Sequence, residues 1–104
     1  MKIEFLYFEG CPNYKPALDN LRQALDETGL IAEIEMVDIA DHTQAVDRRC
    51  LGSPSIRING RDLEADSEHS LDYSMCCRRY RYGGEILGYP SKAMISEVLR
   101  KLRD

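Results

Sequence analysis

The feature that most constrains the fold is a hydrophobic segment at residues 2–8. Both of its faces are apolar or aromatic, with Ile3, Phe5 and Tyr7 on one face and Leu6 and Phe8 on the other. This pattern predicts a β-strand, and a strand that is apolar on both faces is typical of the centre of a sheet covered on both sides. We therefore expect an α/β protein with this strand at the centre of its sheet.

An amphipathic helix is predicted after a break at residues 9–13. Its apolar residues recur at spacings of four, three and four, at Tyr14, Leu18, Leu21 and Leu25. Asn13 is the predicted N-cap, because Pro16 then occupies the third helical position, where no intrahelical hydrogen bond is lost. Gly29 is a good C-terminal stop.

The remainder of the chain is predicted to continue this alternation of strands and helices. Strands are expected at residues 32–39, 55–59, 61–63 and 75–82, a short helix from Asp41 or Thr43 to about Cys50, and a last helix from Ser91. The last helix has an apolar face of Met94, Ile95, Val98, Leu99 and Leu102. Asn59-Gly60 is a strong turn signal, and the acidic residues 64–74 are expected to form a solvated loop. This order favours a parallel strand pair followed by an antiparallel pair, with helices on both faces of the sheet.

Length and composition restrict the possible classes of function. A chain of 104 residues has room for one domain, residues 1–104, and its 43% hydrophobic content excludes a disordered chain. No apolar run approaches the ~20 residues that span a bilayer, so no membrane partner is expected. The net charge of -4 argues against nucleic-acid binding. Residues 1–10 contain Glu4 and Glu9 and lack the features of a secretory signal, so we expect a cytoplasmic protein.

Four cysteines carry most of the potential chemistry: Cys11, Cys50, Cys76 and Cys77. Thiols stay mostly reduced in the cytosol, so these residues are expected to be reactive, metal-binding or buried rather than a disulfide framework. Full pairing would allow three connectivities, and the pairing of adjacent Cys76 and Cys77 would close a strained ring. Cys50 is expected to be a buried structural thiol. Alternation along the strand at 75–82 predicts that one of Cys76 and Cys77 faces the core and the other the surface.

Two motifs resemble the thioredoxin-like superfamily. Cys11-Pro12-Asn13-Tyr14, between the first strand and the first helix, resembles the Cys-Pro-x-Cys site of glutaredoxins, and residues 52–60 resemble the segment that contains the superfamily's cis-proline. The resemblance implies a thioredoxin-like fold, a four-stranded mixed sheet flanked by three helices, with a loop insertion at residues 64–75. It also implies a cis bond before Pro54, with Ser53 beside Cys11. The chain further resembles small bacterial thioredoxin-like proteins, some of them associated with mercury resistance.

The sequence departs from the superfamily at Tyr14, which stands where the second active-site cysteine would be. Exchange within a Cys-x-x-Cys loop is therefore impossible, and the resemblance implies monothiol-type disulfide exchange through Cys11, with Pro12, Ser53 and Pro54 shaping the site. Free N–H groups at the helix N-terminus, together with Lys15, would stabilise the Cys11 thiolate. A mixed disulfide at Cys11 would then be resolved by Cys77 or Cys76, by glutathione, or by another protein. The substrate would be a protein or small-molecule disulfide or another thiophilic species.

Two other classes of function remain open. A soft ion such as Hg, As(III), Cu(I) or Zn could be bound by Cys11 with Cys76 and Cys77, although the paired spacing of structural zinc sites is absent and His42 and His69 are the only imidazoles. The resemblance also allows an iron–sulfur cluster held by Cys11 and glutathione, as in monothiol glutaredoxins. The Gly-Phe-Ser sequence that usually follows the cysteine in those proteins is absent here, which counts against such a cluster. The third class is a non-catalytic interaction domain with a decayed site.

A short basic run near Cys77 has two interpretations. Arg78, Arg79 and Arg81 are interleaved with tyrosines. The run could bind the carboxylates of glutathione or an acidic partner, and a solvated edge strand protected by its charges is the favoured interpretation.

Overall fold

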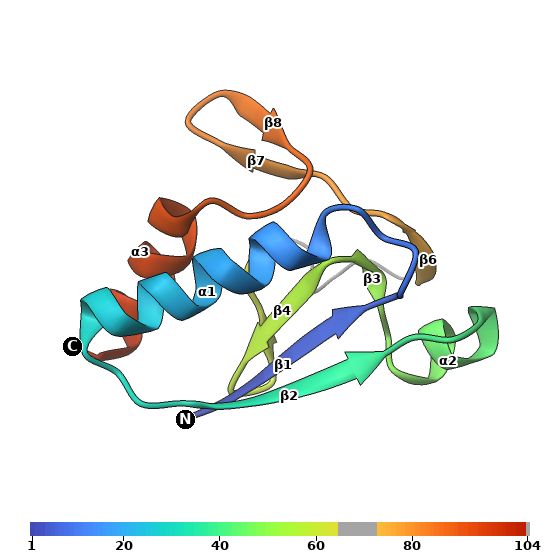
Figure 1. The fold of residues 1–104 in the computed structure, drawn as a ribbon, viewed down its shortest axis with the longest axis horizontal. Coiled ribbons are helices and arrows are strands. Elements are labelled where there is room, and N and C mark those ends of the chain that lie inside the picture. Colours follow the sequence, from blue (N-terminus) through green and yellow to red (C-terminus); the bar gives the residue numbers. More distant parts are fainter. Residues whose placement is uncertain (65–72, 104) are drawn as a thin grey trace.

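A computed structural model of the protein describes residues 1–64 and 73–103. Within these residues the chain forms three helices and eight strands (Figure 1). Their order is β1 (Lys2–Tyr7), α1 (Tyr14–Thr28), β2 (Glu33–Asp38), α2 (His42–Asp47), β3 (Leu51–Ser53), β4 (Ser55–Ile58), β5 (Arg61–Asp62), β6 (Ser74–Cys77), β7 (Tyr80–Tyr82), β8 (Glu85–Leu87) and α3 (Lys92–Arg103). No helix in these two ranges is long and apolar enough to cross a membrane.

The main sheet has four strands in the order β2-β1-β4-β5. β1 pairs with β2 in parallel and with β4 in antiparallel, and β4 pairs with β5 through the turn at Asn59 and Gly60. Both turn residues have positive φ, 52° for Asn59 and 84° for Gly60, which suits a tight hairpin. The prediction of a central first strand is therefore confirmed, and so is the prediction of a parallel pair, β1 with β2, followed by an antiparallel pair, β4 with β5.

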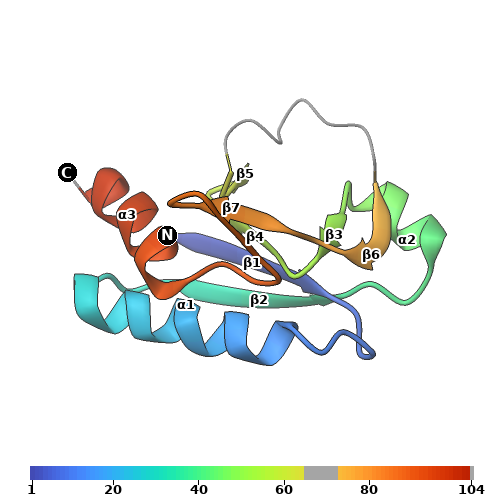
Figure 2. The same cartoon turned by 90° about the horizontal axis from the view of Figure 1, so that it is seen from above.

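Helices cover both faces of this sheet, as predicted. α1 and α3 pack together on one face (Figure 1), over a core that includes Ile3, Phe5, Leu21, Ile56, Tyr80, Ile95 and Leu99. A smaller cluster on the other face joins Leu6 to Val37, Ile39, Ala45 and Cys50, and includes a buried residue of α2. α2 lies beside β3 and β6 at one end of the molecule (Figure 2). The molecule is thus an α/β protein with a mixed four-stranded sheet and three helices in its described residues.

The predicted helix boundaries are confirmed at several caps. Asn13 is the N-cap of α1, so Pro16 is its third residue, and Gly29 ends the helix with φ 70°. Asn13 makes no capping hydrogen bond with its side chain. That side chain lies instead against Gly88, where an added Cβ would come within 2.9 Å of Asn13 Nδ2. Asp41 caps α2 by accepting from the Gln44 N–H at 2.8 Å.

Other predicted boundaries were wrong. α2 ends at Asp47 rather than near Cys50, because the chain must extend again to form β3. The strand predicted at residues 75–82 is two strands, β6 and β7, which join different partners. β8, which pairs with β7, was not predicted. Leu102 is 47% exposed, so the last turn of α3 extends beyond the core that the helix covers.

Besides the main sheet, β3 and β6 form a two-stranded sheet that lies at the candidate site. β3 and β6 pair in parallel, with Leu51 opposite Ser74 and Ser53 opposite Cys77. β6 has one more residue than β3 between these two pairs, which makes a bulge. The loop insertion predicted at residues 64–75 falls largely on residues 65–72, outside the described residues.

Candidate functional site

Cys11 lies in the tight connection between β1 and α1. Its N–H donates to the Phe8 carbonyl oxygen at 3.0 Å, which turns the chain at the end of the strand. Its side chain is only 3% exposed, and its Sγ donates to the carbonyl oxygen of Ser53 at 3.7 Å. The structure thus brings together the two segments that the sequence singled out, residues 11–12 and 53–54.

Ser53 and Pro54 connect β3 to β4. The peptide bond between them is cis, as the resemblance implied. Ser53 is fully buried, and its Oγ has no hydrogen-bond partner among the described residues. Ser55 Oγ donates to the Gly52 carbonyl oxygen at 2.5 Å and helps hold this turn in place.

The backbone of β6 reaches the same carbonyl as Cys11. The Arg78 N–H, directly after Cys77, donates to the Ser53 carbonyl oxygen at 3.0 Å. This oxygen therefore accepts from the Cys11 thiol and from the backbone next to Cys77. Cys76 and Cys77 are both exposed, so the prediction that one of them faces the core was wrong. The bulge in β6 interrupts the strict alternation of sides on which that prediction depended.

Gly52 permits this close approach of β3 and β6. Its φ of +115° is a conformation that residues with a Cβ rarely adopt. A Cβ at this position would lie 2.9 Å from both Arg78 Cβ and the Cys76 carbonyl oxygen. Glycine is therefore required both by the backbone conformation and by the space between the two strands.

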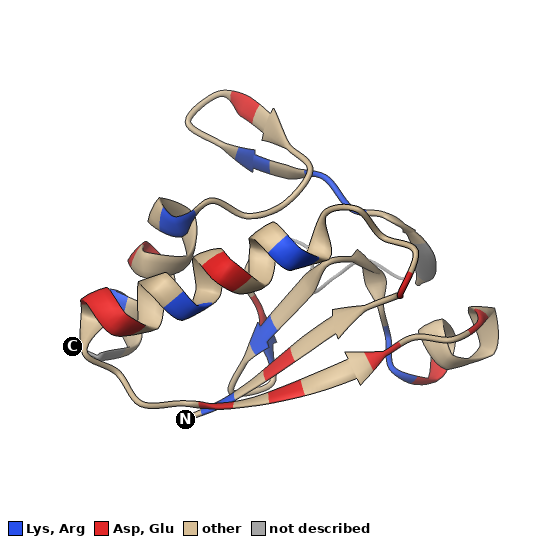
Figure 3. Ribbon diagram, in the orientation of Figure 1, with Lys and Arg blue, Asp and Glu red and all other residues tan. Residues whose placement is uncertain are grey.

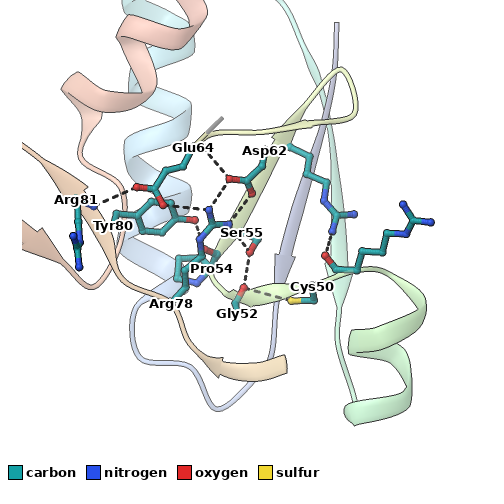
Figure 4. Close-up of polar contacts among 11 residues, drawn as sticks. Cys50, Gly52, Pro54, Ser55, Asp62, Glu64, Arg78, Tyr80 and Arg81 are labelled. Atoms are coloured by element: carbon teal, nitrogen blue, oxygen red, sulfur yellow. Dashed lines mark hydrogen bonds and ion pairs between the residues drawn. The ribbon is translucent and has the colours of Figure 1, made fainter. Parts of the chain in front are cut away.

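A buried ion cluster anchors the chain just beyond β6 (Figure 4). The guanidinium of Arg78 donates to Asp62 through two bonds, Nη1 to Oδ1 at 2.7 Å and Nη2 to Oδ2 at 2.5 Å. It also contacts Glu64 Oε1 at 3.3 Å and Ser55 Oγ at 3.0 Å, and it stacks 4.5 Å above the ring of Tyr80. Burial acts to lower the pKa of Arg78, but the hydrogen bond to Asp62 and the nearby charges raise it overall.

The favoured interpretation of the basic run was wrong for Arg78. Its side chain is only 5% exposed and is paired with acidic residues of the same chain, rather than solvated. Arg79 and Arg81 are exposed, as that interpretation predicted. The acidic segment predicted as a solvated loop is likewise not solvated at its start, because Glu64 pairs with the Arg78 guanidinium and its Oε2 accepts from the Arg81 N–H.

Arg78 and Tyr80 form the wall of the site, because they donate hydrogen bonds to the Ser53 and Pro54 carbonyl groups. The Tyr80 hydroxyl donates to the Pro54 carbonyl oxygen at 2.5 Å, and the side chain is fully buried. Burial is the largest cause that raises the pKa of Tyr80, while the charge of Arg78 opposes it. The successive carbonyl groups of Ser53 and Pro54 therefore accept from residues 78 and 80.

The other predicted site residues lie apart from this contact. Cys50 is buried, as expected, and its Sγ donates to the Gly52 carbonyl oxygen at 3.4 Å. Burial raises the pKa of the Cys50 thiol, although that hydrogen bond partly opposes the shift. Pro12 is exposed, and Tyr14 packs against Tyr7 with ring centroids 4.7 Å apart. The tyrosine in place of a second cysteine thus has a packing role.

The distribution of charged and metal-ligating side chains adds two observations. Lys and Arg alternate with Asp and Glu along α1 (Figure 3), so that helix has no face of a single charge. In the parts of the chain that the structure describes, no three His, Cys, Asp or Glu residues are gathered as ligands for a metal ion. His69 lies outside the described residues.

Sequence reasoning missed three residues that shape this site: Gly52, Asp62 and Tyr80. Gly52 stood within the quoted motif, but its role depends on a strand more than twenty residues later. Asp62 and Tyr80 act through contacts with Arg78 and Pro54. A glycine directly before the Ser-Pro pair was the only local signal.

One protein-family model covers most of the chain, including nearly all of the candidate site. A scan against protein families matches residues 12–98 with the family described as "Domain of unknown function (DUF2703)". The chain belongs to the DUF2703 family. The match contains Ser53, Pro54, Cys76 and Cys77 and begins one residue after Cys11. Searches of the curated proteins and of the solved structures found no match to this DUF2703 protein.

Proposed function

We propose that the protein has a thioredoxin-like architecture and acts in the cytoplasm as a thiol protein, exchanging disulfides through Cys11. The observation that carries this proposal is the contact of Cys11 Sγ with the Ser53 carbonyl oxygen, 3.7 Å away. It joins two segments that are 42 residues apart in the chain and that were each selected for this chemistry from the sequence alone.

The proposed reaction begins with the thiolate of Cys11, which is the nucleophilic form of cysteine. The thiolate attacks one sulfur of a disulfide, forming a mixed disulfide and releasing the other half as a thiolate, which takes up the proton that Cys11 lost. The small exposed fraction of Cys11 favours a low-molecular-weight disulfide over a bulky one. Glutathione disulfide is the simplest probe of this class.

Ser53 and Pro54 would position the reacting sulfur rather than react. The Ser53 carbonyl oxygen fixes the direction of the Cys11 side chain, and its own place is held by the Arg78 N–H. Pro12 is exposed beside Cys11 and forms the outer rim of the site. In this arrangement the turn between β3 and β4 holds the thiol in one orientation for the reaction.

The test is to incubate the reduced protein with glutathione disulfide and to follow the intact mass and the release of glutathione. We expect one glutathione to be released for each mixed disulfide that forms at Cys11, and no mixed disulfide at this position in Cys11→Ser. Cys50→Ser serves as the matched control, because Cys50 is equally buried but makes its hydrogen bond to a different carbonyl. Release that persists undiminished in Cys11→Ser would contradict the proposal.

A second candidate function is the binding of a soft metal or metalloid by Cys11 with Cys77 or Cys76. The convergence of Cys11 and the backbone next to Cys77 on one oxygen favours it. Soft ions prefer thiolate ligands. Metal binding releases no glutathione, so titration of the reduced wild type and of Cys11→Ser with Cu(I), in the absence of glutathione disulfide, distinguishes the two functions. A chain that does neither would be an interaction domain.

A further inference from the structure

We infer that Cys77 is the resolving thiol of this site and closes an intramolecular disulfide with Cys11. This inference rests on the proposed function, since it concerns the fate of the mixed disulfide at Cys11. It gives the reaction a second cysteine that lies 66 positions later in the chain, in place of the cysteine that Tyr14 replaces.

The first support is that Cys11 and the residue directly after Cys77 donate to the same oxygen. The Cys11 Sγ is 3.7 Å from the Ser53 carbonyl oxygen, and the Arg78 nitrogen is 3.0 Å from it. That nitrogen is bonded to the carbonyl carbon of Cys77. The backbone at the end of Cys77 is therefore linked to the thiol of Cys11 through two hydrogen bonds that share one acceptor.

The second support distinguishes Cys77 from its neighbour. In the pairing of β3 with β6 it is Cys77, not Cys76, that lies opposite Ser53. The carbonyl oxygen of Cys76 lies next to Gly52, one residue farther from Pro54, where an added Cβ would come within 2.9 Å of it. The register thus places Cys77 at the level of the residue that contacts Cys11.

The third support is that the remaining cysteine is poorly suited to the role. Cys50 is buried on the opposite face of the sheet, in the cluster with Leu6 and Val37. Its Sγ donates to the Gly52 carbonyl oxygen, and burial raises the pKa of its thiol, which disfavours the reactive thiolate. Cys77 is a free and exposed cysteine, so its sulfur is accessible.

The ion cluster around Arg78 holds Cys77 in place. The guanidinium next to Cys77 is bonded to Asp62 at both ends of its fork and stacks on Tyr80. A bidentate pair of this kind fixes direction as well as distance. The chain at Cys77 is therefore tethered on both sides, by the β3–β6 pairing and by Arg78, which raises the effective concentration of its thiol at Cys11.

The step balances in atoms and electrons. The Cys77 thiolate attacks the Cys11 sulfur of the mixed disulfide, the bond from Cys11 to the substrate half breaks, and that half leaves as a thiolate that takes up a proton. Over both steps one disulfide is reduced to two thiols, and Cys11 and Cys77 are oxidised to one disulfide. A dithiol or two monothiols would return the protein to its reduced form.

The experiment compares wild type with Cys77→Ser, Cys76→Ser and Cys11→Ser after a limited exposure to glutathione disulfide. Cys76 and Cys77 fall in one tryptic peptide, so the serine variants decide which of the two is linked. We expect wild type and Cys76→Ser to give a peptide cross-linked to Cys11 and little glutathionylated protein. Cys77→Ser should give glutathionylated Cys11 that persists at least tenfold longer, and Cys11→Ser should give no cross-link.

Each contrary result has a distinct meaning. Glutathionylated Cys11 that persists in wild type without a cross-link would overturn the role of Cys77 and leave the proposed function intact. A cross-link lost in Cys76→Ser and kept in Cys77→Ser would overturn the choice between neighbours. Absence of glutathionylated Cys11 in Cys77→Ser, with a native circular dichroism spectrum, would contradict the proposed function itself.

Discussion

The carbonyl oxygens of Ser53 and Pro54 determine how the later part of the chain meets the earlier part. The first accepts from the Arg78 N–H and the second from the Tyr80 hydroxyl. A buried carbonyl that loses its donor costs about 1–3 kcal/mol. Loss of the donor to either the Ser53 or the Pro54 carbonyl should therefore be detected as a lower free energy of unfolding.

Tyr80 should make the stability of the protein sensitive to alkaline pH. Burial raises its pKa above the value of about 10 that holds in the unfolded chain. Above pH 10 the unfolded state loses this proton while the folded state keeps it, so the contribution of Tyr80 is complete below that pH and falls as the pH rises. Above pH 10 the free energy of unfolding should therefore fall with pH less steeply in Tyr80→Phe than in wild type. The difference between the two slopes should be up to about 1.4 kcal/mol per pH unit.

The measurement is denaturant unfolding at a series of pH values from about 8 to 11. Tyr80→Phe should be less stable than wild type near pH 8, because the Pro54 carbonyl loses its donor. Equal slopes above pH 10 would show that Tyr80 ionises in the folded state. Tyr89→Phe, at a partly exposed position, is the matched control.

A few specific contacts hold strand β6 in its place. It has β3 as its sheet neighbour, and Gly52 gives it the space to approach. Arg78 then connects it to the acidic residues at the end of β5. Removing either contact should release the strand while the four-stranded sheet stays folded.

Arg78→Lys should loosen β6 at constant charge. A lysine cannot form the two parallel bonds to Asp62 or stack flat on Tyr80, so buried acceptors lose donors. We expect a loss of about 1–3 kcal/mol in the free energy of unfolding and faster hydrogen exchange at the amide of residue 78. Arg79→Lys, at an exposed position, should change the free energy of unfolding by less than about 0.5 kcal/mol.

Arg78→Lys also tests whether Arg78 acts by positioning Cys77 or by changing the reactivity of Cys11. In Arg78→Lys, closure of the cross-link to Cys77 should slow more than the first step at Cys11, because the substitution acts directly on the chain at Cys77 and reaches Cys11 only through the Ser53 carbonyl. Slowing of the first step alone would show that Arg78 acts on Cys11 and not on β6.

Local signals made several elements predictable. The two apolar faces of residues 2–8, the position of Pro16 after Asn13, and the Asn59-Gly60 turn each act within a few residues of the chain. Such features depend on backbone conformation and periodicity, which a sequence displays directly. The structure places each of them as predicted.

The parts that were missed depend on contacts between distant segments. From the sequence alone, Arg78 is expected to be solvated. Its burial depends on Asp62, sixteen positions earlier, which the fold brings against it. β8 has only three residues, and its central Ile86 is 61% exposed, so no buried face marks it. The candidate site was predictable at Cys11, Ser53 and Pro54, whereas the wall behind them was not.

At the scale of the whole molecule, the core is closed by α3. Tyr80, Ile95 and Leu99 join residues of β1, α1 and β4 in a single cluster. The polar contacts between α1 and the α3 region are weaker: Lys92 with Glu27 is exposed, and Asn20 donates to the Pro90 carbonyl oxygen at 3.0 Å. Hydrophobic packing therefore holds the last helix in place.

Two leucines on α3 test this account. Leu99 is fully buried, so Leu99→Ala should lower the free energy of unfolding by about 2–5 kcal/mol through lost burial and the cavity that remains. Leu102 lies one turn later and is nearly half exposed, so Leu102→Ala should cost less than about 1 kcal/mol. Denaturant unfolding of both variants measures the difference, and equal losses would contradict this description of the core.

The hydrogen bonds to the Ser53 and Pro54 carbonyls also constrain the order of events during synthesis. A ribosome makes Cys11 and the Ser53–Pro54 turn well before Arg78 and Tyr80 leave it, and it makes the α3 part of the core later still. Contacts between segments so far apart along the chain form slowly. The nascent chain therefore passes through a period in which Cys11 is present and its final surroundings are not, so oxidants and chaperones encounter this thiol before the enclosing wall exists.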